Sequence, residues 1–209
     1  MAHKIDHSDV PVRLFQSDFL EFFTHISPVT ITAIWLPVAV YFLVDAILRV
    51  QDWVWWHIPV AFLIGLLLWT LAEYLLHRFV FHFPPRNAQQ ERITFLFHGV
   101  HHAQPQEKTR LVMPPIISLP LAALFYGLFV LILQVVLGMS EWVSPMFSAF
   151  IFGYLAYDLT HYATHHFPMR VGYLKFLKRY HMQHHYKTPN DRYGVTSPIW
   201  DRVFGTLPK

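Results

Sequence analysis

Four long apolar stretches alternate with polar ones along this chain. They cover residues 29–48, 58–76, 115–138 and 143–160. The hydrocarbon core of a bilayer is about 30 Å thick and takes roughly 20 helical residues, so each stretch is long enough to cross it. The pattern predicts an all-α, polytopic membrane protein with four transmembrane helices in a single domain, residues 1–209.

The segment before the first span, residues 1–28, is amphipathic in its second half. From Val12 to His25, phenylalanine and leucine side chains recur between charged and amide side chains, as in a helix with one apolar face. Two placements fit this pattern equally: a helix lying in the membrane interface, or a helix packed on the protein's own core. We treat the segment as interfacial.

Lysine and arginine lie almost entirely on one side of the predicted spans. Two precede the first span, five lie between the second and third, and eight follow the fourth, whereas Arg49 alone lies in the two opposite loops. Positive residues collect on the cytosolic side of a membrane, so both termini and the polar segments after the second and fourth spans are predicted to be cytosolic. The opposite loop contains Trp53, Trp55 and Trp56, which is typical of a membrane interface.

The composition fits a membrane protein better than a soluble one, because 54% of the residues are hydrophobic and 14% are charged. The net charge is +3, but the basic residues flank apolar spans, which favours anionic membrane lipids as partners and argues against nucleic acid. The chain has no cysteine, so a metal site must use nitrogen and oxygen ligands. Residues 207–209 carry no endoplasmic reticulum retrieval signal, so that membrane and a bacterial inner membrane fit equally.

Ten histidines form four groups that follow a duplicated plan, in which a pair at the cytosolic end of a span precedes a triplet. The triplets are spaced i, i+3, i+4, which places their side chains on one face of a helix. In the first pair the two residues are five apart and would diverge by about 140° on a regular helix, so we expect the helix to end or bulge there. The groups are His77 and His82; His98, His101 and His102; His161 and His165; and His181, His184 and His185.

These histidines predict a cytosolic, helical, metal-binding region that caps the spans. Imidazole suits iron, copper, nickel and zinc, and ten ligands are too many for one ion. Two ions with about five imidazoles each would leave a position open for oxygen or substrate. A zinc hydrolase needs only three protein ligands, so the number favours activation of dioxygen for attack on an unactivated C–H bond. A metal transporter or sensor is the alternative, but its ligands should line a path near the bilayer midplane.

Two carboxylates lie inside the apolar spans, close to histidines. Glu73 precedes His77 by four residues and Asp158 precedes His161 by three, so each can share a helical face with its histidine. An imidazole that binds a metal through one nitrogen commonly donates the N–H of its other nitrogen to a carboxylate, and we assign both residues to that orienting role. A salt bridge to a neighbouring basic residue such as Arg78 is the alternative. Asp191 and Asp201 lie in the polar tail and receive no role.

The four histidine groups resemble the histidine boxes of the membrane fatty acid hydroxylase and sterol desaturase superfamily. Within it, the chain is most similar to the fatty acid 2-hydroxylases. The similarity covers roughly residues 69–206 and includes flanking stretches at 72–74, 110–115, 193–197 and 200–206. The resemblance implies hydroxylation of the acyl chain of a sphingolipid such as ceramide, or of its fatty acid precursor. A sterol or carotenoid hydroxylase or oxidase of the same superfamily is the alternative.

The resemblance also implies a dimetal centre that holds iron in the working enzyme, consumes O2 and receives electrons from a cytochrome b5 or a ferredoxin. Zinc can take the place of iron during expression, since imidazole accepts both. Only about 28 residues precede the first span, too few for a cytochrome b5 domain, so we expect a separate redox partner. Because the histidines begin at span ends, near the membrane interface, carbon 2 of an acyl lipid is the predicted site of attack.

Overall fold

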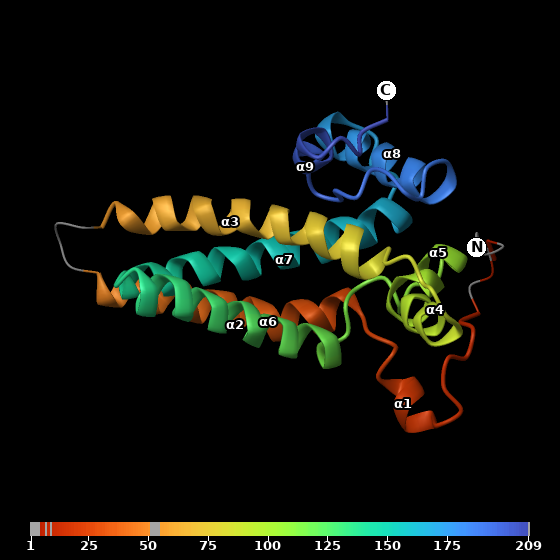
Figure 1. The fold of residues 1–209 in the computed structure, drawn as a ribbon, viewed down its shortest axis with the longest axis horizontal. Helices are drawn as coiled ribbons and strands as arrows, with labels where there is room; N and C mark the ends of the chain where they lie inside the picture. The colour runs from red at the N-terminus through yellow and green to blue at the C-terminus, as the bar shows by residue number, and fades with distance from the viewer. Residues whose placement is uncertain (1–4, 7, 9, 51–54, 209) are drawn as a thin grey trace.

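The computed structural model describes residues 5–6, 8, 10–50 and 55–208, and within these ranges it is helical and contains no strand. The elements in chain order are α1 (Asp18–Phe22), α2 (Pro28–Arg49), α3 (His57–Leu75), η1 (Leu76–Phe81), α4 (Ala88–Thr94), η2 (Phe95–Gly99), α5 (Val100–Ala103), α6 (Pro115–Phe129), η3 (Val130–Val136), η4 (Ser140–Trp142), α7 (Val143–His166), α8 (Gly172–Tyr186) and α9 (Ile199–Val203). The helices α2, α3, α6 and α7 run side by side, and α1, α4, α5, α8 and α9 gather towards one of their ends (Figure 1).

Three helical segments in the described part of the chain are long and apolar enough to cross a membrane. They are Pro28–Arg49, His57–Phe81 and Pro115–Val136, close to the first three predicted spans. Leucine, valine and isoleucine side chains on their outer faces are exposed, as on lipid-facing helices. The described part of the chain is therefore that of a helical membrane protein, with three spans supported by length and composition.

The predicted fourth span falls in α7, which does not belong to those three segments. This helix packs against both α2 and α3, and sixteen of its residues are buried. A helix covered by its neighbours can carry polar side chains such as Ser148 and Asp158, so its sequence is less apolar than that of a lipid-facing helix. A fourth crossing by α7 remains a prediction.

Two glycines let α3 and α7 approach closely. A Cβ atom on Gly65 would lie 2.3 Å from the carbonyl oxygen of Met146, and one on Gly153 would lie 2.6 Å from the side chain of Trp69. Small residues at such contacts bring helix backbones together and increase packing between them. This contact packs α3 against α7, and clustered histidines lie further along, on η1 after α3 and in the last part of α7.

The end of α3 confirms the bulge expected from the spacing of His77 and His82. The chain continues past α3 as one π-helical segment, η1, and the amide of His82 donates to the carbonyl of His77 at 3.0 Å. A bond between residues five apart widens the turn, so the two side chains come to the same side. A second π-helical segment, η2, precedes His101 and His102.

The N-terminal segment differs from the helix predicted between Val12 and His25. Only the five residues of α1 are helical, because the Glu21 carboxylate accepts bonds from the amides of Leu14 and Phe15 at 3.0 and 2.8 Å and keeps that stretch out of the helix. Phe19 and Phe22 are exposed. Whether this segment lies in a membrane interface remains a prediction.

The end of the bundle opposite α4 and α5 carries the last residues of α2 and the first residues of α3 (Figure 1), with η4 packed against both helices. Trp55 and Trp56 are exposed there, as expected for aromatic residues at a membrane interface. Trp53 lies outside the described residues. All ten clustered histidines lie at the other end, on η1, η2, α5, α7 and α8 and in the residue that follows η1.

Candidate metal centre

The ten predicted histidines come together in two groups of five. In each group the ring nitrogens that face one another all lie within 4.8 Å of one another. The first cluster consists of His77, His82, His98, His102 and His184, and the second cluster consists of His101, His161, His165, His181 and His185.

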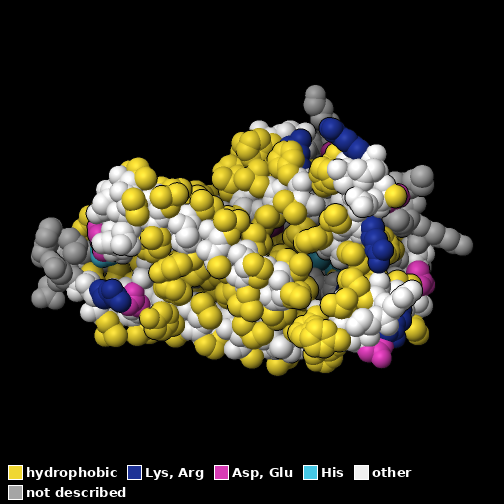
Figure 2. All heavy atoms as spheres, turned by 60° about the horizontal axis from the view of Figure 1, so that its bottom comes forward, with side chains coloured by type: hydrophobic (Ala, Val, Ile, Leu, Met, Phe, Trp, Pro, Cys, Tyr) yellow, Lys and Arg dark blue, Asp and Glu magenta, His cyan; other side chains and the backbone are white. Residues whose placement is uncertain are grey.

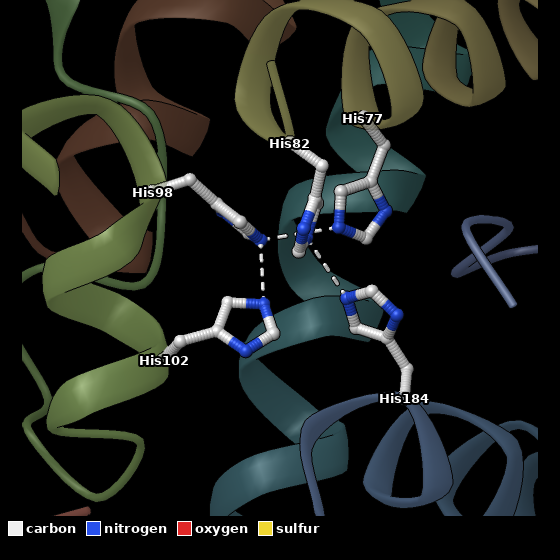
Figure 3. A group of neighbouring side chains, drawn as sticks. All are labelled: His77, His82, His98, His102 and His184. Atoms are coloured by element: carbon white, nitrogen blue, oxygen red, sulfur yellow. Dashed lines mark hydrogen bonds between the residues drawn. The ribbon is translucent and has the colours of Figure 1, made fainter. Parts of the chain in front are cut away.

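The first cluster draws on three parts of the chain, as its five rings show (Figure 3). The Nε2 atom of His98 lies 3.1 Å from Nε2 of both His77 and His102, and Nε2 of His184 lies 3.1 Å from Nε2 of His82. The rings meet edge to face, with their Nε2 atoms directed at one another.

The second cluster has the same geometry. Nε2 of His101 lies 2.9 Å from Nε2 of His161 and 3.0 Å from Nε2 of His185. Nε2 of His181 lies 2.9 Å from Nε2 of His165 and 3.0 Å from Nε2 of His185. All five side chains are buried.

The clusters do not follow the pair-plus-triplet order of the sequence. The pair His77 and His82 takes only two members of the next triplet and receives His184 from the later one. In exchange, His101 joins the second cluster. Each triplet therefore contributes to both clusters, which the duplicated plan did not predict.

These distances fit metal coordination by imidazole. Two nitrogens bonded to one ion at about 2.1 Å, with about 90° between the bonds, lie about 3.0 Å apart. His77 and His184 add a chemical argument, because their Nδ1 atoms lie 2.5 and 2.7 Å from the carbonyl oxygens of Tyr193 and Asp191. A carbonyl can only accept, so each Nδ1 carries the proton and each Nε2 presents a lone pair to the cluster. Lone pairs that converge in a buried site require a cation.

The protonation state of the site also suits a metal. Burial, reinforced by the neighbouring imidazoles, holds the pKa of His98, His101 and His185 well below the usual 6.5. Burial and the neighbouring His184 and His102 lower the pKa of His82 to about 2. The rings are therefore neutral at physiological pH, which is the form that binds metal.

The two predicted orienting carboxylates are buried beside the site but contact other groups. Glu73 accepts from the amides of Val195 and Thr196 at 2.6 and 2.9 Å, and Asp158 accepts from the amide of Met113 at 3.2 Å. The direct bond to a histidine that we predicted for each is absent among the described residues, as is a salt bridge to either. Buried N–H groups of nearby loops need acceptors, and these carboxylates supply them.

An apolar cavity of about 310 Å³ adjoins both clusters. Its walls include His98 from the first cluster and His101 and His161 from the second, together with Asp158. The rest of the wall comes from the N-terminal segment, from η2 and α5, and from residues 110–117. Figure 2 shows the face on which hydrophobic side chains surround a hollow with histidine visible inside it. A molecule in this cavity would be mostly in contact with hydrocarbon and would reach the histidines.

Arg110 holds in place the part of the cavity wall that the N-terminal segment forms. Its guanidinium donates to the carboxylate of Glu21 and to the carbonyl of Val12, each at 2.5 Å. The hydroxyl of Thr109 lies 2.5 Å from Nδ1 of His25. Leu14, Phe15, Leu20 and Phe23 of the segment then face the cavity.

The role of the carbonyl groups of Tyr193 and Asp191 as acceptors could not be predicted from the sequence, because almost every residue has such a carbonyl group. It also assigned no role to Asp201, which is fully buried. The available signal was that this carboxylate lies in the stretch 200–206, which resembles the fatty acid 2-hydroxylases.

The fold and the site define the class: a helical membrane protein with two histidine clusters of metal-binding geometry beside an apolar cavity. The model of the fatty acid hydroxylase family matches residues 62–206. The chain belongs to this family, which confirms the resemblance drawn from the histidine boxes, and it is an oxidoreductase.

Individual relatives agree with this family assignment. Dihydroceramide fatty acyl 2-hydroxylase FAH2 of Arabidopsis thaliana is 39% identical over 200 residues, which cover 94% of this chain and 80% of that protein. The ceramide very long chain fatty acid hydroxylase scs7 of Schizosaccharomyces pombe is 41% identical over 193 residues, covering 90% of this chain and 53% of that protein. A solved structure of full-length scs7p, in which only the hydroxylase domain is visible, matches with a TM-score of 0.81 and 38% identity, covering 92% of this chain and 70% of that one. The chain thus spans about half of the longer relatives that it matches.

Proposed function

We propose that this protein is a membrane monooxygenase that uses O2 to hydroxylate carbon 2 of fatty acyl chains, either free or in a sphingolipid such as ceramide. The observation that carries the proposal is the apolar cavity whose wall contains histidines of both clusters. Relatives named dihydroceramide fatty acyl 2-hydroxylase and fatty acid 2-hydroxylase support the choice of substrate. A sterol or carotenoid substrate is the alternative that the assay below must exclude.

Two transition-metal ions, one in each cluster and expected to be iron, would supply the activation of dioxygen, and zinc would fit the same imidazole ligands. All ten histidines are the proposed ligands. The chain's own contribution is to keep these imidazoles neutral by burial and to orient them. The walls of the cavity exclude water and hold the acyl tail, so that a C–H bond is held beside the metal positions.

The proposed reaction breaks one C–H bond at carbon 2 and inserts one oxygen atom of O2. The other oxygen atom leaves as water, which requires two electrons and two protons. Side chains cannot be the net source of two electrons in every turnover, because each would have to be reduced again from outside, so we propose a separate haem or iron–sulfur protein, of the cytochrome b5 or ferredoxin type, as the donor.

The proposed orientation places both termini and the metal centre on the cytosolic side of the endoplasmic reticulum or of a bacterial inner membrane. The distribution of lysine and arginine supports this side, and α7, running beside α2 and α3, is proposed as a fourth crossing (Figure 1). A lipid bound from this membrane would keep its polar end at the interface and extend its tail into the cavity. Carbon 2, next to that polar end, would then need little displacement to reach the site.

The test is hydroxylation of acyl lipids that carry two deuterium atoms at carbon 2. Reconstituted protein with iron, O2 and a reducing system should yield a hydroxylated product that has lost one deuterium, as measured by mass spectrometry. An anaerobic sample and the His82→Ala variant are the controls and should yield none. A product that retains both deuterium atoms would show attack at another carbon, and turnover of sterols but not of acyl lipids would favour the alternative.

A further inference from the structure

The segment 191–196, between α8 and α9, lies against the first cluster. Its carbonyl oxygens at Tyr193 and Asp191 accept the Nδ1–H bonds of His77 and His184, at 2.5 and 2.7 Å. These bonds set which nitrogen carries the proton and how each ring is turned. The backbone position of this segment therefore controls two of the five histidines of the first cluster.

Two buried carboxylates hold this segment by four consecutive amides. Asp201, which is fully buried, accepts from the amides of Tyr193 and Gly194 at 2.9 and 2.8 Å. Glu73, which is 3% exposed, accepts from the next two amides, those of Val195 and Thr196, at 2.6 and 2.9 Å. A carboxylate is acceptor-only and can take several such bonds, so the four amides leave the segment little freedom to shift.

Each carboxylate is itself tied to the fold. The hydroxyl of Thr206 donates to Asp201 at 2.7 Å, and the amide of Thr206 donates to the Asp201 carbonyl at 2.8 Å. Glu73 lies on α3 one helical turn before His77, so the same helix carries both the histidine and the anchor of the loop that orients it.

The segment has no room for a different path. A Cβ atom on Gly194 would lie 2.0 Å from the carbonyl oxygen of Ser197 and 3.0 Å from the Asp201 carboxylate. Arg192 adopts a left-handed backbone with φ of 60°, and its amide donates to the carbonyl of Thr206 at 3.0 Å.

Segment 191–196 makes no hydrogen bond to the second cluster among the residues that the structure describes, and the backbone partner of His161 there is Leu111, outside that segment. The Nδ1 atoms of His101, His165, His181 and His185 are buried and form no hydrogen bond with those residues. A disturbance of the segment 191–196 should therefore act on the first cluster and leave the second unchanged.

We propose that Asp201 and Glu73 are positioning residues of the first cluster, which fix His77 and His184 through the backbone of residues 193–196. The proposal rests on the metal centre in the proposed function. It assigns a role to Asp201 and changes that of Glu73 from a direct partner of His77 to an anchor of the loop that orients His77.

The experiment compares Asp201→Asn and Glu73→Gln with the unmodified protein. Each substitution turns one acceptor oxygen into an NH2 group that faces a backbone donor. The ion of the first cluster is observed alone in a His165→Ala background, and that of the second in a His82→Ala background. Release of metal to a chelator, followed by elemental analysis, should become about 10- to 100-fold faster for the first ion and stay unchanged for the second.

A second readout does not depend on metal. In the metal-free protein labelled with 15N histidine, NMR should show His77 and His184 protonated at Nδ1, and Asp201→Asn should convert part of this signal to the other tautomer. If the unmodified protein holds no metal, the proposed function fails, while this measurement still decides the present proposal.

Two further variants make the test specific. Asp45→Asn is the matched control, because Asp45 is a carboxylate bonded to Arg49 and Ser144 far from the site, and it should leave both readouts unchanged. Thr196→Val removes only the hydroxyl bond to Glu73 and should have a smaller effect of the same sign, which covers the case in which Asp201→Asn does not fold. Equal release of both ions, or release and tautomer signals equal to those of Asp45→Asn, would overturn the proposal.

Discussion

Alanine substitutions can test which histidines share an ion. The sequence order groups His82 with His101, whereas the structure groups His82 with His184. The double variant His82→Ala/His184→Ala should therefore lose one ion and keep the other. The double variant His82→Ala/His101→Ala should lose both, because it removes one ligand from each cluster.

The expected magnitude follows from the coupling of metal binding to folding. Each ion that binds only the folded chain adds ~2.7 kcal/mol to the free energy of unfolding at a metal concentration one hundred times Kd. Loss of one ion should lower Tm by roughly 5 to 11 °C for a chain of this size. Loss of both ions should remove ~5.4 kcal/mol, so the two double variants should differ measurably even though each lacks two histidines.

The assay is elemental analysis of protein purified without chelators, with thermal unfolding in detergent on the same samples. We expect two ions per chain in the unmodified protein, one in His82→Ala/His184→Ala and none in His82→Ala/His101→Ala. The opposite pattern, with one ion left when His82 and His101 are both replaced, would refute the grouping seen in the structure. One ion or none in the unmodified protein would refute the dimetal centre itself.

Three further predictions concern the packing, the cavity and pH. Gly65→Ala should destabilise the protein by ~1–3 kcal/mol, measured by thermal unfolding, since its Cβ would lie 2.3 Å from the carbonyl of Met146; an unchanged Tm would contradict the tight contact between α3 and α7. Val112→Trp should narrow the cavity and reduce turnover of acyl lipids at least tenfold while both ions are retained, and full turnover would place the substrate elsewhere. Below pH 6.5 His82 binds a proton in the unfolded chain, but not in the folded protein, where its pKa is about 2. The metal-free protein should therefore lose stability progressively as the pH falls from 6.5 towards 2. A stability that rises as the pH falls over this range would contradict a neutral cluster.

Much of the fold follows from local rules that the sequence displays. Apolar length predicted the helices at 28–49, 57–81 and 115–136 to within a few residues. The spacing of His77 and His82 predicted the bulge because no regular helix brings residues five apart to one side. The N-terminal helix was overestimated because hydrophobic pattern alone cannot show that the Glu21 side chain would compete for the amides of Leu14 and Phe15.

The site was predictable in its membership but not in its internal connections. Residue type and spacing identified all ten histidines that the structure brings together. The partners of Glu73 could not be predicted, because they are amides of Val195 and Thr196, more than 120 residues away along the chain. Tertiary contacts of this kind depend on how α9 and the preceding loop return to α3, and local pattern does not contain that information.

The division of each triplet between the clusters nevertheless has a reason in helix geometry. On an α-helix, residues i and i+4 point about 40° apart, whereas residues i+3 and i+4 point about 100° apart. His181 and His185 are four apart and join the second cluster, while His184 points away from His185 and joins the first. His98 and His102 likewise share the first cluster, and His101 reaches the second. A triplet with this spacing thus presents two directions, so it serves a pair of adjacent ions better than a single one, and the presence of two such triplets is itself an argument that the centre holds two ions.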